Sequence, residues 1–316
     1  MSRAVRVLSI DGGGVRGIIP ALVLAEMERR TGMAVGRMFD FVAGTSTGGL
    51  LALGLSMPDE AGEPALRTAR VIEMYEKAGQ SIFVRTSHNP VHPLLHERYP
   101  SDHIERTLDA YFGDTPLSAA ATEVMVTSYD LLSRDVVLMS SAAARDDSSL
   151  DLPMRVAARA TSAAPTYFHP VPVRLGTPSR DRLLIDGGVF ANNPAMCAYT
   201  EVQRRRPGAE VAMVSLGTGD PVRPLPQHEV RDWGLAHWAR AILHVVLDGA
   251  SEVVHLQLRE LLDRRRYIRL QVDLRQANDH LDDATTGNIE LLRAEAERLI
   301  AERDGEIDAA CALVAG

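Results

Sequence analysis

Two glycine-rich turns, each between an apolar strand and an apolar helix, constrain the fold of this chain most. The first lies in VRVLSIDGGGVRG, residues 5–17, and the second in FDFVAGTSTGGLLALGL, residues 39–55. A strand that passes directly into a helix is the repeating unit of parallel sheets, because parallel strands need a crossover connection. We therefore predict an α/β fold.

The rest of the chain alternates between strands and helices in the same way. Apolar runs predict strands at Val5–Ile10, Phe39–Ala43, Glu123–Tyr129, Asp135–Ser140, Arg182–Ile185, Glu210–Leu216 and Tyr267–Val272. Helices are predicted at Ile18–Arg30, Gly48–Met57, Arg67–Gly79, Asp102–Phe112, Pro153–Ala160, Asn193–Arg206, in several pieces between Trp233 and Arg266, and from Asn288. No repeat or linker interrupts the pattern, so we expect a single domain over residues 1–316.

Composition and charge limit the partners of the chain. Of its 316 residues 46% are hydrophobic, which is enough for a large core, and a net charge of −8 argues against nucleic-acid binding. With only two cysteines, Cys197 and Cys311, we expect no disulfide framework and a reducing compartment. The first strand starts too early for a signal peptide, and the longest near-apolar stretch, residues 48–57, is too short to span a bilayer. We expect a cytoplasmic protein that docks transiently on membranes.

The first glycine turn has two interpretations. Residues 12–17 fit the G-x-G-x-x-G pattern of a dinucleotide site, but the same bare backbone amides could hold the oxyanion of a reacting carbonyl. A dinucleotide site needs a second strand that ends in an acidic residue about 20 residues further on. Here residues 32–37 form a poor strand without an acid, and Asp40 precedes the next strand. We therefore favour an oxyanion site made by Gly12, Gly13 and Gly14.

The second turn predicts a nucleophile. Gly44-Thr45-Ser46-Thr47-Gly48 is a G-x-S-x-G pentapeptide between an apolar strand and an apolar helix, which is the context of a nucleophile elbow. The helix start directs its N–H groups and positive dipole end toward developing negative charge. A plain glycine-rich turn with a solvated serine is the alternative.

A serine nucleophile needs a base, and Asp186 is the best placed candidate. RLLIDGG brings Asp186 to the end of a buried strand, and partial desolvation raises the pKa of a carboxyl group toward the working range of a base. A carboxylate that merely caps a turn is the alternative. None of the histidines that follow Asp186 sits in a short loop after a clean strand, so we expect surface or packing roles for His228, His237, His244, His255 and His280.

Four ordered blocks of sequence resemble the patatin-like phospholipase family: LSIDGGGVRGIIPALVL, FDFVAGTSTGGLLAL, ATSAAPTYF and DGGVFANNP. The resemblance implies a three-layer α/β/α sandwich around a mostly parallel sheet. It also implies a Ser46–Asp186 dyad without histidine, calcium, other metal or cofactor, and an oxyanion loop at glycines 12–14. Members of the family cleave fatty-acyl esters of glycerophospholipids and related lipids, so we expect a lipid substrate at a membrane or micelle surface.

Several points stay open at this stage. Arg16, where the family's motif carries a basic residue, can stabilise the oxyanion loop, attract a lipid phosphate or pair with a nearby carboxylate. The block at residues 160–168 can line the site or form an ordinary packed loop. Residues 81–100 can form a mobile cover or a packed loop, and the prolines between His88, His92 and His96 argue against a metal site there. A soluble esterase or thioesterase of small acyl groups, and a storage or interaction protein with an inert site, are the competing functions.

Overall fold

A single eight-stranded sheet organises the part of the chain that the computed structural model describes. That part comprises residues 3–65, 67–73, 82, 99–222, 230–231 and 233–315, with the backbone alone described at 235–237, 239–241 and 243–244. The strands follow the order β5–β6–β3–β2–β1–β7–β9, with β4 paired to β3. Their bounds are Val5–Ile10 (β1), Phe41–Gly44 (β2), Glu123–Asp130 (β3), Asp135–Ser140 (β4), Val171–Leu175 (β5), Arg180–Asp186 (β6), Val211–Leu216 (β7) and Tyr267–Leu270 (β9).

The centre of the sheet is parallel and one side is antiparallel. β3, β2, β1, β7 and β9 run in the same direction, whereas β4 and β6 pair antiparallel with β3, and β5 pairs antiparallel with β6. Strands β8 (Asp220–Pro221) and β10 (Asp273–Leu274) form a separate two-stranded ladder. The expected mostly parallel sheet is confirmed, and it is mixed.

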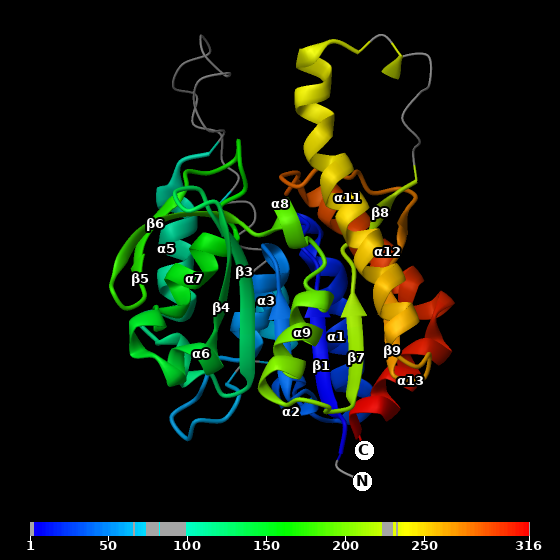
Figure 1. Cartoon of the computed structure of the whole chain (residues 1–316). Coiled ribbons are helices and arrows are strands. Elements are labelled where there is room, and N and C mark those ends of the chain that lie inside the picture. The colour runs from blue at the N-terminus through cyan, green and yellow to red at the C-terminus, as the bar shows by residue number, and fades with distance from the viewer. Residues whose placement is uncertain are drawn as a thin grey trace.

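Helices cover both faces of the sheet and make three layers (Figure 1). On one face, residues such as Leu8 and Val42 pack in a core with α1 (Ile18–Thr31), α3 (Thr47–Leu55), α5 (Ser101–Phe112), α7 (Met154–Thr161), α12 (Thr286–Glu302) and α13 (Asp304–Ala315). Val7 and Phe41, their neighbours along the same strands, point to the other face and pack with α9 (Ala195–Arg205) and α11 (Leu235–Leu261). This alternation is the period of two that a strand imposes on its side chains.

The structure differs from the predicted elements in several places. β2 begins at Phe41 and not at Phe39, because the Asp40 carboxylate accepts hydrogen bonds from the backbone and guanidinium of Arg6. β5 is an additional strand that carries Pro172, a residue that belongs on sheet edges. The segment after Trp233 forms one long helix, α11, instead of several.

Strand register brings the two predicted catalytic residues to the same edge of the sheet. On β3, Val126 lies opposite Gly44, the last residue of β2, and Ser128 lies opposite Asp186, the last residue of β6. Two residues of strand span roughly 7 Å. β6 is antiparallel to β3, and its last residue lies two positions of β3 beyond the end of β2. Asp186 therefore lies next to the turn that follows Gly44.

Within the described residues, no helix combines the length and the apolar character that crossing a bilayer requires.

Candidate active site

Ser46 occupies a tight turn between β2 and α3. Its backbone has φ 54° and ψ −122°, a left-handed conformation that residues other than glycine seldom adopt. A Cβ at Gly44 would lie 2.1 Å from the carbonyl oxygen of Gly48, so only glycine allows the chain to pass itself here. The turn thus has the geometry of the predicted nucleophile elbow.

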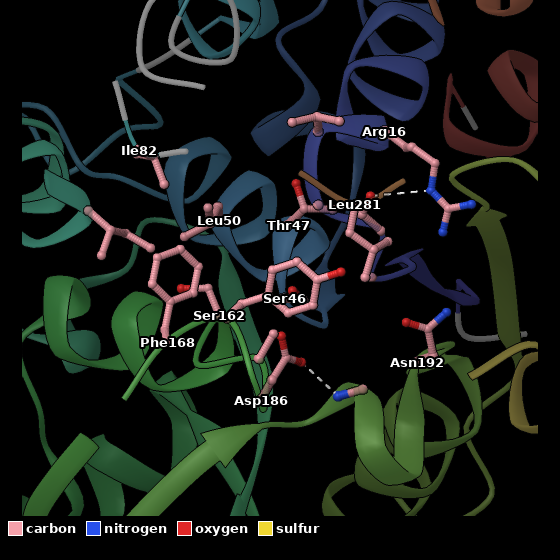
Figure 2. Close-up of a pocket in the computed structure, with 18 of the residues that line it drawn as sticks. Arg16, Ser46, Thr47, Leu50, Ile82, Ser162, Phe168, Asp186, Asn192 and Leu281 are labelled. Atoms are coloured by element: carbon pink, nitrogen blue, oxygen red, sulfur yellow. Dashed lines mark hydrogen bonds between the residues drawn. The ribbon is translucent and has the colours of Figure 1, made fainter. Parts of the chain in front are cut away.

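Asp186 lies beside Ser46 in the wall of the same cavity (Figure 2). Burial raises the pKa of the Asp186 carboxyl to about 6, while hydrogen bonds from the Ser46 hydroxyl and from the Gly188 amide act in the opposite direction. The Gly188 amide donates to Oδ1 at 2.8 Å. The structure therefore brings together a serine hydroxyl and a carboxylate that is a stronger base than an exposed one.

The raised pKa of Asp186 predicts how stability depends on pH. Below pH 3.8 this carboxyl is protonated in both folded and unfolded chains, and as pH rises toward 6 the unfolded chain loses its proton first, which lowers the free energy of unfolding. The variant Asp186→Asn has no ionisable group at this position, so its free energy of unfolding does not fall in this way. Its side-chain oxygen can still accept the hydrogen bond from the Gly188 amide. We expect urea denaturation to show the variant more stable than wild type at pH 8, by on the order of 2–3 kcal/mol, with the difference shrinking toward pH 4. A difference that does not change with pH would contradict the buried, ionisable carboxyl.

Hydroxyl groups on neighbouring elements hold the elbow in place. The Ser46 amide donates to Oγ1 of Thr161 at 3.0 Å, and the Thr45 hydroxyl lies 2.7 Å from that of Thr127 and donates to the carbonyl of Ala191 at 2.6 Å. All three threonines are fully buried. A serine held by buried polar partners keeps its orientation, which a reacting group needs.

The three glycines of the first turn do not offer three equivalent amides. The Gly12 amide donates to the carbonyl of Asn192 at 2.9 Å, so its hydrogen is already engaged. In the described part of the chain, the amides of Gly13 and Gly14 have no hydrogen-bond partner. The expected oxyanion loop therefore has two available donors, and the expectation for Gly12 needs this correction: a Gly12–Asn192 hydrogen bond ties the loop to the segment after Asp186.

Hydrogen bonds to the carbonyls of Gly12 and Gly13 fix the direction of the two available amides, because each carbonyl shares a peptide group with one of these amides. Thr218 Oγ1 donates to the Gly12 carbonyl at 2.7 Å, while the amide and Nε of Arg16 donate to the Gly13 carbonyl at 3.2 and 3.3 Å. In a trans peptide the N–H points away from the C=O of the same plane. Because the carbonyls of Gly12 and Gly13 point toward Thr218 and Arg16, the amides of Gly13 and Gly14 point away from these two residues. Gly14 has φ +58°, and a Cβ there would meet the carbonyl of Leu281 at 2.0 Å.

Arg16 acts as a clamp on this loop. Its side chain is buried, and besides Gly13 it donates to the carbonyl of Gly219 at 3.1 Å. Burial lowers the pKa of the guanidinium, and surrounding carboxylates, led by Asp248, oppose that shift. Figure 2 shows the guanidinium turned away from Ser46 and Asp186. Of the roles open for Arg16, the geometry matches loop stabilisation beside carboxylates, and contact with a lipid phosphate stays a prediction.

An ion pair fixes the end of β1, where the glycine loop begins. Asp11 and Arg269 form a two-pronged salt bridge, with N–O distances of 2.9 and 2.5 Å, and the Ser251 hydroxyl donates to the same carboxylate at 3.1 Å. Both charged side chains are almost fully buried. Paired and hydrogen-bonded in this way, the two buried charges are satisfied and fix the start of the loop relative to β9 and α11.

The cavity around Ser46 and Asp186 is lined mainly by apolar side chains. The empty space here is about 1050 Å³ with open solvent at the mouth included, and the apolar lining includes Leu50, Ile82, Leu108, Phe168, Leu247 and Leu281 (Figure 2). Residues 162, 164, 165, 167 and 168 of the block at 160–168 also line it, so this segment contributes to the site. The space beside the Ser46 hydroxyl and the Asp186 carboxylate therefore suits an apolar acyl chain.

None of the histidines with a described side chain lines this cavity. His255 lies elsewhere, with Nδ1 3.1 Å from the Tyr267 hydroxyl, and His280 is exposed. His88, His92, His96 and His228 lie outside the described residues, as do the side chains of His237 and His244. In the described ranges no group of three or more His, Cys, Asp or Glu side chains is placed to hold a metal ion.

Thr218 provides a test of the anchored loop. Thr218→Val keeps the shape of the side chain but removes the hydrogen bond to the Gly12 carbonyl, so the adjacent Gly13 amide loses its fixed direction. We expect kcat for a soluble ester to fall about tenfold, the equivalent of one hydrogen bond, with KM little changed. Thr218→Ser, which keeps the hydroxyl, should retain kcat. A rise in KM alone, or no change, would contradict the role of Thr218 as a positioning residue.

Together the fold and the site place this chain among the serine hydrolases that act on carboxylic esters. A model of the patatin-like phospholipase family matches residues 8–199, and the chain belongs to this family of serine lipid acyl hydrolases. Patatin-like protein 2 of Arabidopsis thaliana is 31% identical over 94% of this chain and 83% of its own length. Patatin-17 of Solanum cardiophyllum is 29% identical over 95% of this chain and 84% of its own length. The structure of VipD from Legionella pneumophila aligns with 95% of this chain and 67% of the VipD chain. The sequence identity is 12% and the TM-score is 0.39, which is too weak a similarity to support an inference.

Proposed function

We propose that this protein hydrolyses fatty-acyl esters of glycerophospholipids and related lipids through a Ser46–Asp186 dyad, without calcium. The observation that carries the proposal is the position of Asp186: a buried carboxylate with a pKa raised to about 6, beside a serine hydroxyl at the wall of an apolar cavity. Serine is a weak nucleophile until a neighbouring base accepts its proton. At neutral pH a carboxyl with this pKa is mostly ionised, and yet basic enough to take that proton transiently.

The reaction proceeds in two halves. Asp186 takes the proton of the Ser46 hydroxyl while Oγ of Ser46 attacks the ester carbonyl carbon. The electrons of the C=O double bond move onto the carbonyl oxygen. When the tetrahedral intermediate collapses, the C–O bond to the leaving alcohol breaks, and Asp186 returns the proton to that alcohol. In the second half Asp186 deprotonates a water molecule, which attacks the acyl-enzyme. The fatty acid leaves and Ser46 regains its proton.

The amides of Gly13 and Gly14 are the proposed donors to the oxyanion. Their availability supports this role, as do the anchors on the preceding carbonyls from Thr218 and Arg16. Donors that are already fixed in place need no reorganisation when charge develops on the carbonyl oxygen, and one such donor is worth about 10²–10³ in rate.

The apolar lining favours a long acyl chain over a small acyl group. Leu50 of α3, Leu108 of α5 and Phe168 of the loop after α7 all line the cavity, so a chain placed there buries apolar surface against several segments. Such substrates reside in membranes and micelles. We propose that the protein acts from the cytoplasm while transiently bound to such a surface.

Product analysis with mixed lipids tests this function. Wild type and Ser46→Ala are incubated with vesicles of mixed glycerophospholipids, and the lipids are analysed by mass spectrometry. We expect free fatty acids and lysophospholipids with wild type only. Activity should also rise steeply as a short-chain phospholipid passes its aggregation threshold. Hydrolysis restricted to small soluble esters, with no change across that threshold, would assign the site to a soluble esterase or thioesterase. A folded protein that releases no product from either substrate would contradict catalysis.

A further inference from the structure

The outer face of α11 is unusually apolar. Of the eleven large hydrophobic residues that the structure describes as exposed, seven lie on this helix, each 41–56% exposed: Trp238, Ile242, Val245, Val246, Val253, Leu256 and Leu261. A helix on the surface of a monomer normally turns charged or polar residues outward. A concentration of apolar side chains on one exposed face marks an interaction surface.

These side chains form a stripe along the helix. Trp238, Ile242, Val245, Gly249, Val253 and Leu256 follow one another at spacings of four and three residues, so they share one face over about 27 Å. The opposite face is used inside the molecule, where Leu247 lines the active-site cavity and Leu258 is fully buried. The stripe is therefore separate from the packing that attaches α11 to its own chain.

The N-terminal half of α11 projects as an arm. Figure 1 shows it in yellow, extending beyond the ends of the strands, while the C-terminal half lies along the flank of the molecule near β9. The arm carries Trp238, Ile242 and Val245, whereas Val253 and Leu256 lie on the half that follows the flank. The apolar stripe thus continues from the projecting arm onto the flank.

The stripe is symmetric about Gly249. Val245 and Val253 lie four residues before and after it, and Ile242 and Leu256 lie seven before and after. A glycine inside a helix costs about 1 kcal/mol relative to alanine, and a Cβ at Gly249 would meet no described atom within 4 Å. Packing within the chain therefore gives no reason for glycine, whereas a second helix crossing at this point would approach more closely over it.

We propose that α11 is the interface of a homodimer, in which the α11 helices of two copies pack antiparallel across a twofold axis at Gly249. In this arrangement Val245 meets the partner's Val253, and Ile242 meets the partner's Leu256. The arm of each copy then lies along the flank of the other. A twofold interface must be self-complementary, and the symmetric stripe provides that property from one helix. Spacings of three and four are those of helices that pack side by side.

A second copy fits the stripe better than a lipid surface does. A flat membrane that meets the projecting N-terminal half of α11 would leave exposed the C-terminal half, which lies along the flank and carries Val253 and Leu256. An antiparallel partner covers both halves at once. The proposal also connects the interface with the active site, since the helix that forms it contributes Leu247 to the cavity wall.

Sedimentation velocity and light scattering over a wide concentration range test the interface. We expect wild type to have the mass of two chains and Val245→Glu, which would place an unpaired charge in the interface, to dimerise at least about tenfold more weakly. Val136→Glu changes a similarly exposed valine on β4 and is the matched control, with wild-type dimerisation. A monomeric wild type, including one whose Trp238 inserts into lipid vesicles, or a Val245→Glu variant that dimerises normally, would overturn the proposal.

A charge exchange tests the antiparallel register. Val245→Lys and Val253→Glu should each weaken the dimer, and the double variant should recover it. In the double variant the introduced ammonium group of each copy faces the introduced carboxylate of the other, so two ion pairs form across the twofold axis. In a parallel pair the double variant would bring like charges together. A double variant that dimerises more weakly than both single variants would overturn the proposed register.

Discussion

Ser46→Ala is expected to lower kcat/KM for ester hydrolysis by at least about 10⁴-fold while the protein stays folded. Removing a serine nucleophile ends the covalent pathway, and the residual rate comes from binding and the oxyanion donors alone. The side chain of Ser46 is small, and the hydrogen bond to Thr161 Oγ1 is donated by the backbone amide of Ser46 and not by its hydroxyl, so the melting temperature should change little. Initial rates with a chromogenic ester, together with circular dichroism, check both points.

Ser162→Ala is the matched control for this experiment. Ser162 also lines the cavity, but its hydroxyl donates to the carbonyl of Ala158 at 2.7 Å within α7 and the turn that follows. We expect this variant to keep activity within a small factor of wild type. Comparable losses in the two variants would indicate that any serine-to-alanine change in the cavity harms the enzyme, and would contradict a special role for Ser46.

Asp186→Asn is expected to lower kcat by about 10²–10⁴-fold, because the asparagine amide cannot accept the proton of Ser46. For wild type the raised pKa predicts the pH dependence. The base must be deprotonated to act, so kcat/KM of a non-ionising ester should rise with pH, reach half its plateau near pH 6 and stay level above it. The midpoint is about two units above that of an ordinary aspartate.

Histidine variants separate this profile from that of a histidine base, whose ordinary pKa lies in the same range. We expect His255→Ala and His280→Ala to keep the acid limb and the plateau rate. Loss of the limb in one of them, with Asp186→Asn still active, would replace the dyad by a histidine-dependent mechanism.

Local patterns in the sequence were enough to predict the glycine-flanked turn at Ser46, the place of Asp186 at a strand end and most of the strands. Strand-to-helix turns with glycines leave a local signature, and so does an aspartate at the end of an apolar run. The antiparallel strand β5 escaped prediction because Pro172 weakens its pattern. Its neighbour β6 was predicted because Leu183, Leu184 and Ile185 form a continuous apolar run.

The partners of the glycine loop could not be predicted from local pattern. Thr218 reaches the Gly12 carbonyl across 206 positions of sequence, and Arg269 reaches Asp11 across 258. A threonine or arginine at a strand end carries no sign of its distant partner, so only the folded arrangement reveals it. The hydrogen bond from the Gly12 amide to the Asn192 carbonyl could not be predicted for the same reason.

The part of the chain beyond residue 199 completes the site. The family model ends there, yet Thr218 and Arg269 fix the loop, and Leu247 and Leu281 line the cavity. Ser46 and Asp186 themselves lie within the matched region.

Covalent labelling with a fluorophosphonate tests the central claim most directly, since such probes phosphonylate an activated serine. Peptide mass spectrometry should find one adduct, on Ser46, that forms faster as pH rises through about 6. Asp186→Asn should label far more slowly than wild type, whereas His255→Ala should label at the wild-type rate. An adduct on another residue, or equal labelling rates for wild type and Asp186→Asn, would contradict a Ser46 nucleophile activated by Asp186.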